Sequence, residues 1–402
     1  MKNRYINRNI YTDKILPFTE KNLIKVIVGQ RRVGKSYLLF QIIDYIQNND
    51  PKANIIYINK ERYEFDTIKN YTELIKYCTN KFRKNHKNYI FIDEIQDIEN
   101  FEKALRHFSS EPDTDIYCTG SNAKLLSGEL ASSLSGRYIE IKVYGLSYLE
   151  FLEFHQLENH IQSLNKYLEI GGLPYIINLS PQNEVIFEYL RNIFSTIIYK
   201  DIITRYKIRN HIFLENLVKY LANNTGNLIS AKKISDYLKS QNLKMSPQIV
   251  LDYLSYLENA FLVFKVNRSD LSGKKIFETN EKYYFEDIGL KNALTGENNI
   301  QINQVVENAV FNHLKIAGYD VKVGVSGNKE IDFIAYKNGK KLYVQAAYLL
   351  PDQQVIDREF GNLLEVNNNY KKMVVSLDQY APKNVQGVEH IHLIDFLSNT
   401  KI

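Results

Sequence analysis

The sequence contains no tryptophan and only two cysteines, Cys78 and Cys118. Two cysteines are too few for a disulfide framework, and these two lie too far apart in the chain to form a zinc-binding pair. We expect both to be buried, reduced thiols. The missing tryptophan accompanies abundant tyrosine, lysine, asparagine and isoleucine, which indicates genome composition, so the 30 tyrosines are no signal of a base-stacking platform.

Long apolar runs are also absent, because none reaches the roughly 20 residues that a membrane-spanning helix needs. The first residues, Met1-Lys2-Asn3-Arg4-Tyr5, lead into no signal-like core. We therefore expect a cytoplasmic protein without a membrane partner. No internal repeat or low-complexity tract is present.

A strong charge of either sign is lacking as well. The net charge of +5 and the pI near 8.7 are compatible with an anionic partner, but they fall well short of a dedicated nucleic-acid binder. With 402 residues, 44% of them hydrophobic, the chain is long enough to pack two or three domains.

A complete phosphate-binding loop is present, with two glycines, a lysine and a serine at fixed spacing. Apolar residues 23–28 predict a buried strand before it, and the spacing of residues 37–46 predicts a helix after it. Glycines let backbone N–H groups approach phosphates, and the helix N-terminus adds positive potential. We expect Lys35 to reach the β- and γ-phosphates of ATP and Ser36 to hold Mg²⁺. The expected nucleotide-binding residues are Gly29, Gln30, Arg31, Arg32, Val33, Gly34, Lys35, Ser36 and Tyr37.

Two carboxylates complete the expected hydrolytic site. Residues 89–92 predict a buried strand that ends in Asp93 and Glu94. We expect Asp93 to order the Mg²⁺ shell and Glu94 to position the attacking water. A buried strand that ends in a solvated acidic turn would show the same pattern, and the phosphate-binding loop favours the catalytic interpretation.

A third strand, over residues 115–119, leads into Gly120, Ser121 and Asn122. Ligands bind at the carboxyl ends of strands in α/β sheets, so Ser121 or Asn122 is a candidate sensor of the γ-phosphate. An ordinary turn needs the same residue types. Arg137, before a strand over residues 138–143, is a candidate transition-state cation in cis or across a subunit interface, with an ordinary surface arginine as the slightly favoured alternative.

Residues 26–151 resemble the AAA-type ATPases that occur in bacteria and archaea as stand-alone proteins with a long C-terminal extension. In addition to the phosphate-binding loop, the matching segments are Asp93-Glu94-Ile95-Gln96, Thr119-Gly120-Ser121-Asn122, Leu134-Ser135-Gly136-Arg137 and Leu146-Ser147-Tyr148-Leu149-Glu150-Phe151. The resemblance implies a helical lid with a turn like Gly171-Gly172-Leu173-Pro174. By analogy Pro174 contacts the base, although a helix-ending turn explains the same residues equally well.

A helical pattern over residues 184–209 carries several charges. Asp201 and Arg205 stand one turn apart, which is typical of an ion pair on an exposed helix face. The alternative is a basic surface that contacts DNA or a neighbouring subunit, and we favour the ion pair because lone charge patterns are weak signals. The charged residues are Arg191, Lys200, Asp201, Arg205, Lys207 and Arg209.

The spacing from Phe213 onward predicts a winged helix: one helix to about Asn223, a second over 231–239 capped by Ser230, and a third opened by Ser246-Pro247. Strands over 261–266 and 282–285 would form the wing. The expected buried stripe of the third helix is Ile249, Val250, Tyr253, Leu254 and Leu257.

Sequence-specific DNA reading by this third helix is not expected. A helix that reads the major groove normally brings arginine, lysine, asparagine or glutamine to base edges, and residues 246–259 contain Asp252 and Glu258 but no lysine or arginine. Arg268, Lys274 and Lys275 on the wing are candidates for backbone contacts with DNA. A protein-docking role is the alternative.

The last hundred residues resemble the restriction-endonuclease-like fold that is appended to the same ATPase family. Asp332 matches the first acid of that fold and Glu307 the acid on its helix, but Gln345 stands where a second carboxylate belongs and Ala347 where the lysine belongs. Because two carboxylates hold the metal and the lysine steadies charge, the resemblance implies a degenerate nuclease. Lys340 or Lys341 is the candidate for a migrated lysine.

The predicted fold class is α/β: an AAA-type P-loop parallel sheet with a helical lid, then a winged helix, then a restriction-endonuclease-like α/β domain. The predicted domains cover residues 1–152, 153–209, 210–295 and 296–402. The leading hypothesis is an ATPase that acts as a molecular switch on DNA or a DNA-associated partner, as a monomer or an oligomer. The alternatives are an ATP-gated protein-docking module with little turnover and a metal-dependent DNA nuclease.

Overall fold

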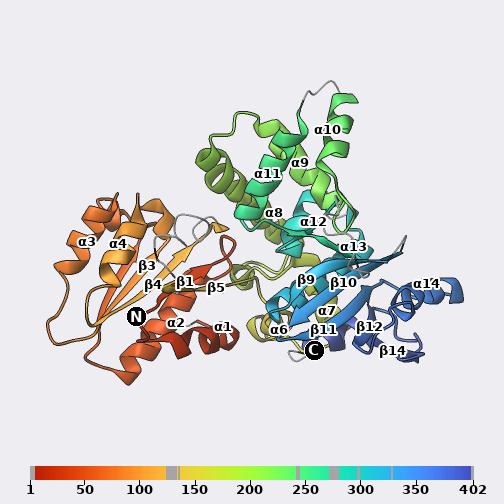
Figure 1. Ribbon diagram of the computed structural model, residues 1–402, viewed down its shortest axis with the longest axis horizontal. Helices are drawn as coiled ribbons and strands as arrows, with labels where there is room; N and C mark the ends of the chain where they lie inside the picture. Colours follow the sequence, from red (N-terminus) through yellow and green to blue (C-terminus); the bar gives the residue numbers. More distant parts are fainter. Residues whose placement is uncertain are drawn as a thin grey trace. The chain divides into compact units, whose positions relative to one another are not determined.

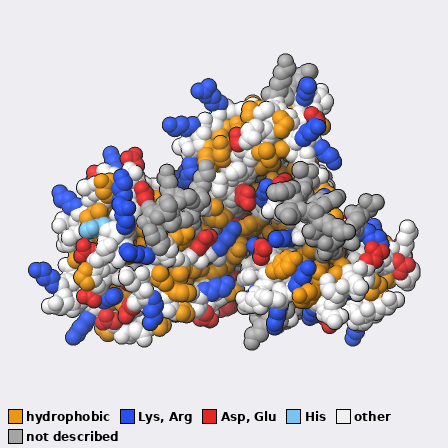
Figure 2. Space-filling model, in the orientation of Figure 1, with side chains coloured by type: hydrophobic (Ala, Val, Ile, Leu, Met, Phe, Trp, Pro, Cys, Tyr) orange, Lys and Arg blue, Asp and Glu red, His pale blue; other side chains and the backbone are white. Residues whose placement is uncertain are grey.

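The computed structural model describes residues 5–123, 134, 136–240, 245–270, 280–296, 299–326 and 329–399 (Figure 1). Ser135 of the matched motif and the wing candidates Lys274 and Lys275 lie outside these residues. The chain divides into two compact units, Met1–Tyr144 with Asn259–Phe261 and Gly145–Glu258 with Leu262–Ile402. Figure 2 shows Lys and Arg side chains spread singly among Asp and Glu over the visible face, as expected for a mildly basic protein.

The first unit is built on a five-stranded sheet with all strands parallel. Its order is β2-β3-β4-β1-β5, so β1 lies between β4 and β5. The three central strands, β1, β3 and β4, are buried at every position, as expected for strands covered on both faces. The strands are β1 (Ile24–Val28), β2 (Asn54–Asn59), β3 (Asn88–Asp93), β4 (Thr114–Gly120) and β5 (Tyr138–Lys142).

Helices cover both faces of this sheet. Figure 1 shows α3 (Tyr71–Thr79) and α4 (Phe101–Phe108) on one side of the strands, and α1 (Asn9–Ile15) and α2 (Lys35–Asn49) on the other. The predicted helix over 37–46 is confirmed, and it begins two residues earlier, at Lys35. A capping box of Asn70 and Glu73 fixes the start of α3.

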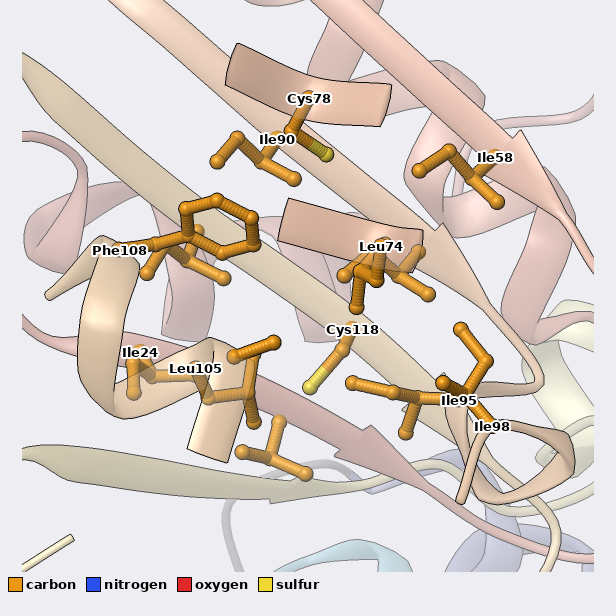
Figure 3. Packing of buried hydrophobic residues seen from close by; sticks show 14 of the residues in the cluster. Ile24, Ile58, Leu74, Cys78, Ile90, Ile95, Ile98, Leu105, Phe108 and Cys118 are labelled. Carbon is orange, nitrogen blue, oxygen red and sulfur yellow. The ribbon is translucent and has the colours of Figure 1, made fainter. Parts of the chain in front are cut away.

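One core cluster fills the space between the sheet and the pair α3 and α4. Figure 3 shows strand residues such as Ile24 and Ile90 pointing toward Leu105 and Phe108 of α4. Cys78 and Cys118 belong to this cluster as free thiols, which confirms that both are buried. Burial raises the pKa of each thiol to about 12.

The second unit begins with helices. Their ranges agree with the predicted helices in this region to within a few residues. Ser230 and Ser246 cap α10 and α11 through their side-chain oxygens, at 3.2 and 3.3 Å from the backbone nitrogens of Lys233 and Ile249. The helices are α6 (Tyr148–His155), α7 (Ile161–Ile170), α8 (Asn183–Thr196), α9 (His211–Asn223), α10 (Ala231–Ser240), α11 (Pro247–Asn259) and α12 (Ile288–Thr295).

Two expectations about these helices are wrong. Ile249 is 38% exposed, so the buried stripe of α11 is made by Val250, Leu254 and Leu257. Asp201 is 1% exposed instead of lying on an exposed face. The physical reason is that α8 continues as a π-helix over Ile197–Thr204, and the wider winding changes which residues face inward.

The second unit also contains a mixed seven-stranded sheet with three helices. The strand order is β13-β14-β12-β11-β10-β9-β7. The strands are β7 (Arg268–Asp270), β9 (Asp320–Ser326), β10 (Lys329–Lys337), β11 (Lys340–Ala346), β12 (Lys371–Ser376), β13 (Asn384–Val385) and β14 (Val388–His392), with helices α13 (Ile302–Ile316), α14 (Gln353–Leu364) and α15 (Leu393–Ser398).

A short antiparallel pair, β6 (Val263–Val266) and β8 (Lys282–Phe285), lies where the wing strands were predicted. The following strand β7 pairs in parallel with β9 and so joins the larger sheet. The segment between α11 and α13 therefore contributes to both sheets. No helix among the described residues is long and apolar enough to cross a membrane.

Candidate functional site

The phosphate-binding loop connects the carboxyl end of β1 to the amino end of α2. Gly29 has φ +157°, and a Cβ atom at this position would lie 2.1 Å from the carbonyl oxygen of Val143, so only glycine fits. Gly34 has φ +96° and precedes the first helical residue, Lys35. The backbone is thus shaped as the sequence motif predicts, with the N-terminus of a 15-residue helix facing the loop.

Lys35 is buried inside the loop. Its Nζ donates hydrogen bonds to the carbonyl oxygens of Gly29 at 3.0 Å and Gln30 at 2.9 Å, and it lies 3.9 Å from Oε1 of Glu94. The side chain is 4% exposed. These contacts keep the ammonium group over the loop, where it can neutralise a phosphate group.

Asp93 ends β3 beside the loop. Thr119 Oγ1 donates a hydrogen bond to Asp93 Oδ1, and Tyr57 Oη donates to Oδ2 at 3.2 Å. Burial raises the pKa of the Asp93 carboxyl, against the opposing effect of hydrogen bonds from Thr119 and Ser36. Ser36 and Asp93 are therefore adjacent, as residues that share one metal ion must be.

Glu94 follows in a left-handed backbone conformation, with φ +58°, that is uncommon outside glycine. Its N–H donates to Thr119 Oγ1 at 3.0 Å, so one threonine positions both carboxylates. Burial by itself would raise the pKa of Glu94, but the charges of Lys35 and Arg31 and hydrogen bonds from Gln96 and Ser121 outweigh it and lower the pKa. Glu94 is therefore ionised at neutral pH, as a general base must be.

The remaining loop and sensor residues differ in how far they are buried. Gln30, Val33, Ser121 and Asn122 are buried, and the Gln96 amide donates to Glu94 Oε2 and, at 3.4 Å, to Ser121 Oγ. Both amide atoms of Gln30 are buried without a hydrogen-bond partner. Arg31 is buried and donates to Glu61 at 2.9 Å, while Arg32 and Tyr37 are exposed.

Arg137 lies at the opposite end of the sheet from the loop. Its carbonyl oxygen accepts from the N–H of Ile24, the first residue of β1, whereas the loop follows the last residue, Val28. Five strand residues separate the two ends by roughly 16 Å, which exceeds the reach of an arginine side chain. The structure thus places Arg137 too far away to act in cis on the loop of its own chain.

Pro174 belongs to the second unit, where it opens a 3₁₀-helix over Pro174–Asn178. The preceding turn packs on the start of α12, because Gly172 N donates to Asp287 Oδ2 at 2.8 Å. Asp287 also caps α12 by accepting from Leu290 N at 2.9 Å. Packing against α12 gives the two glycines of this turn a structural role.

A second group of ionisable residues lies between α13, β8 and β10. Lys282 Nζ is 3.0 Å from Glu307, 2.8 Å from Glu330 and 3.2 Å from Asp332. Tyr284 Oη donates to Glu307 at 2.6 Å. Burial and the charge of Asp332 raise the pKa of Glu307 to about 7, although Lys282 opposes the shift. The two acids that matched the nuclease pattern, Glu307 and Asp332, are therefore brought together.

The lysine at these acids is not one of the two that sequence reasoning proposed. Lys340 and Lys341 open β11 at its turn with β10, and Lys341 Nζ lies 4.8 Å from the ring centre of Tyr343. They pair with Lys337 and Tyr336, several residues along the strand from Asp332. Lys282 was missed because it lies in a segment distant from Glu307 and Asp332, and no local sequence pattern links this lysine to these acids.

Comparison with known proteins agrees with the geometry of the first unit. The family model of the AAA domain matches residues 21–152, and a domain of unknown function matches residues 161–301. An uncharacterized protein of Haemophilus influenzae is 38% identical over 404 residues, which cover 99% of this chain and 100% of that protein. An uncharacterized protein of Methanocaldococcus jannaschii is 32% identical over 416 residues, which cover 97% of this chain and 89% of that protein.

The chain belongs to the family of these two proteins. Its N-terminal part is an AAA-type P-loop domain. A solved structure, the Walker-type ATPase of Pyrococcus abyssi, shares the fold with a TM-score of 0.50 at 16% identity, over 72% of this chain and 96% of that one.

Sequence reasoning missed several residues that build the site in the AAA domain. Arg8 Nη1 donates to the carbonyl oxygens of Val33 at 2.9 Å and Tyr144 at 3.0 Å, which ties the N-terminal segment to the loop. Thr119 and Tyr57 hold Asp93 from neighbouring strands. Thr119 carried a signal, because it ends the strand predicted over residues 115–119, next to the predicted sensor, whereas Arg8 carried none.

Proposed function

We propose that this protein binds and hydrolyses ATP with Mg²⁺ and acts as a molecular switch on DNA or on a DNA-associated partner. The observation that carries the proposal is the meeting of Lys35, Ser36, Asp93 and Glu94 at one edge of the AAA-type sheet. Lys35 lies beside the loop carbonyls and Glu94, Ser36 lies beside Asp93, and the lowered pKa of Glu94 keeps that carboxylate ionised. The residues present fit a nucleotide triphosphate and a magnesium ion.

The roles follow from the contacts. The loop amides and Lys35 would hold the β- and γ-phosphates, and Ser36 and Asp93 would hold Mg²⁺, which neutralises charge on phosphate oxygens when it is bound. Glu94 would accept a proton from the attacking water, because its lowered pKa keeps it ionised. The Gln96 amide donates to both Ser121 and Glu94, so a phosphate sensor at Ser121 is linked through Gln96 to the general base Glu94.

The decisive experiment compares ATP binding and turnover in the full chain, Lys35→Ala and Glu94→Gln. We expect Lys35→Ala to lose binding of a fluorescent ATP analogue. Glu94→Gln should keep binding and lose turnover by at least about a hundredfold. If the wild type and Glu94→Gln hydrolyse ATP equally slowly, the protein is an ATP-gated docking module and the proposal fails.

DNA is the partner that the second unit favours. Helices α9, α10 and α11 followed by the antiparallel pair β6 and β8 support the winged-helix interpretation of residues 210–295. On α10, the side chains of Lys232, Lys233 and Lys239 are exposed. Exposed lysines without a base-reading helix favour contacts with the phosphate backbone and little sequence preference.

This part of the proposal is tested by measuring ATP turnover with and without single- and double-stranded DNA. We expect stimulation by DNA that weakens in a variant with Lys232, Lys233 and Lys239 changed to alanine. A matched control changes three exposed lysines of the first unit, Lys52, Lys76 and Lys84, and removes the same charge. Equal loss in both variants would contradict a specific role for α10.

A protein partner is the second candidate, and one observation favours it. Ile249 and Leu251 on α11 are 38% and 41% exposed, so this helix presents apolar side chains on its surface. Turnover that ignores DNA would point to docking of a protein on this helix.

We further infer a cytoplasmic location, a lid over residues 153–209 and a nuclease-like domain over 296–402.

A further inference from the structure

Three carboxylates of the second unit gather where the nuclease resemblance predicts a metal ion. Glu330 and Asp332 stand two residues apart on β10, so both side chains lie on the same face of the sheet. Glu307 comes from α13, which packs against β10 (Figure 1). A divalent cation would be the expected partner of such a group.

The centre of this group is filled by the ammonium group of Lys282. An ammonium group has three N–H donors, and each of the three carboxylates lies within 2.8 to 3.2 Å of Nζ. Lys282 is 3% exposed. Burial by itself would lower its pKa, but the surrounding acidic groups raise it well above the usual value, so the cation is permanent.

The remaining groups around the acids also leave little freedom for a metal ion. Asp332 Oδ2 accepts the N–H of Ala346 at 3.0 Å, and Gln345 donates its amide to Glu359 at 2.9 Å. Gly226 lies against Glu307, because a Cβ there would approach its carboxylate to 2.8 Å. Among the described residues, no group of three or more acidic, histidine or cysteine side chains is arranged to hold a metal ion.

We propose that the Lys282 ammonium replaces the divalent metal of a nuclease-like site, so that this domain holds a permanent internal cation and binds no metal. The cluster then fastens β8 to α13 and β10, and it explains why a lysine at the position of Ala347 and a carboxylate at the position of Gln345 are dispensable. This inference goes beyond the proposed ATPase, because it concerns only the second unit.

The test uses the full chain without nucleotide, in an Asp93→Asn background that removes the carboxylate expected to order Mg²⁺ at the ATP site. Mn²⁺ is titrated and its free concentration is followed by electron paramagnetic resonance. We expect no Mn²⁺ binding and no change in Tm while Lys282 is present. Lys282→Ala should lower Tm by roughly 5–15 °C, because three carboxylates lose their cation.

Mn²⁺ should bind to the Lys282→Ala protein and recover much of the lost Tm. Adding Asp332→Asn should abolish this rescue. A folded Lys282→Ala protein that binds no Mn²⁺ would overturn the proposal, since its carboxylates would then form no cation site. Mn²⁺ binding by the protein with Lys282 intact, lost in Asp332→Asn, would overturn it equally.

A second measurement decides the question if Lys282→Ala does not fold. The wild-type chain is incubated with DNA and Mg²⁺ or Mn²⁺, beside Asp332→Asn. We expect no cleavage by either protein. Cleavage that depends on Asp332 would show that Lys282 works beside a metal as a nuclease lysine, and neither result depends on whether the ATP site functions.

Discussion

At the scale of single residues, burial and partners decide what each ionisable group does. Lys35 and Lys282 are both buried lysines, yet Lys35 is held by two carbonyl oxygens and Lys282 by three carboxylates. Carbonyl groups carry no net charge, and the one carboxylate near Lys35, that of Glu94, lies 3.9 Å from Nζ, so Lys35 is only partly neutralised. Lys282 is already neutralised and therefore serves the structure.

Thr119 is the residue that aligns the two catalytic carboxylates, so its hydroxyl should matter for turnover. Thr119→Val keeps the shape of the side chain but removes both hydrogen bonds, one to Asp93 and one from the N–H of Glu94. We expect ATP turnover to fall by roughly ten- to a hundredfold, with nucleotide binding retained. Steady-state hydrolysis and analogue binding measure the two effects. Thr119→Ser keeps the hydroxyl and should remain close to the wild type; an equal loss in both variants would rule out the alignment role.

Asp287 should make stability depend on pH in a defined window. Burial raises its pKa from 3.8 to about 6, despite hydrogen bonds from Gly172 and Leu290. The folded state therefore binds the Asp287 proton more tightly than the unfolded state does. The stability that this protonation adds to the fold is fully present below about pH 4 and is lost as the pH rises to about 6. The loss is roughly 3 kcal/mol at most.

Urea unfolding of the wild type and Asp287→Asn from pH 4 to pH 7 measures this dependence. The asparagine does not titrate, so the difference between the two proteins isolates the carboxyl from all other acids. We expect the wild type to lose stability relative to the variant as the pH rises. A difference that stays constant with pH would contradict the raised pKa.

At the scale of elements, the central strands are joined by a buried charge pair as well as by backbone hydrogen bonds. Lys25 on β1 forms an ion pair with Asp115 on β4, and both side chains are almost fully buried. Burial lowers the pKa of Lys25, although Asp115 partly offsets the effect. Asp115 also accepts from the hydroxyl of Tyr117 and the N–H of Glu20.

Removing one partner of this ion pair should reduce the free energy of unfolding more than replacing both partners with apolar residues. Asp115→Ala leaves a buried ammonium without a partner and should lower the free energy of unfolding by about 3–5 kcal/mol. Changing Lys25→Met together with Asp115→Leu should cost less than Asp115→Ala alone. Urea unfolding of Lys25→Met, Asp115→Leu and the double variant that combines them measures the coupling. Additive losses would show that the two charges do not stabilise each other.

The π-helix explains why a correctly predicted helix had a wrongly predicted exposed face. The sequence predicted a helix over residues 184–209, and helical structure is present there. The period of an α-helix would place Asp201 on the exposed face. The segment 197–204 is a π-helix, which winds more widely and turns Asp201 inward. Thr204 Oγ1 donates to the carbonyl oxygen of Tyr199, five residues earlier, at 2.8 Å.

At the scale of the whole molecule, the position of Arg137 bears on assembly. The end of β5 that carries it lies opposite the phosphate-binding loop, so a transition-state role requires a second subunit. Mixing Arg137→Ala with Glu94→Gln tests this. A mixed assembly pairs the intact Glu94 of one variant with the intact Arg137 of the other.

We expect the mixture to hydrolyse ATP faster than the sum of the two variants measured separately. The matched control mixes Arg137→Ala with a chain that carries both Arg137→Ala and Glu94→Gln, which offers no intact Arg137. If the mixture equals that sum, Arg137 is an ordinary surface arginine. Turnover of Arg137→Ala alone equal to the wild type would lead to the same conclusion.

The nucleotide site could be predicted from the sequence because its parts are local. Gly29 follows β1, Lys35 and Ser36 begin α2, and Asp93 and Glu94 come at the carboxyl end of the apolar strand β3. Parallel strands place their carboxyl ends along one edge of the sheet, so two local motifs suffice to define the site. The AAA-type fold of this part is confirmed by the matched family and the shared structure.

Tertiary structure alone decided the rest, because the deciding contacts join residues that are far apart in the sequence. Arg8 reaches Val33 and Tyr144, and Lys282 reaches Glu307, Glu330 and Asp332. Strand pairing also determined that Arg137 faces away from its own loop. Periodicity and motif spacing report on neighbours within a few residues, whereas burial and charge neutralisation depend on where the folded chain brings distant segments together.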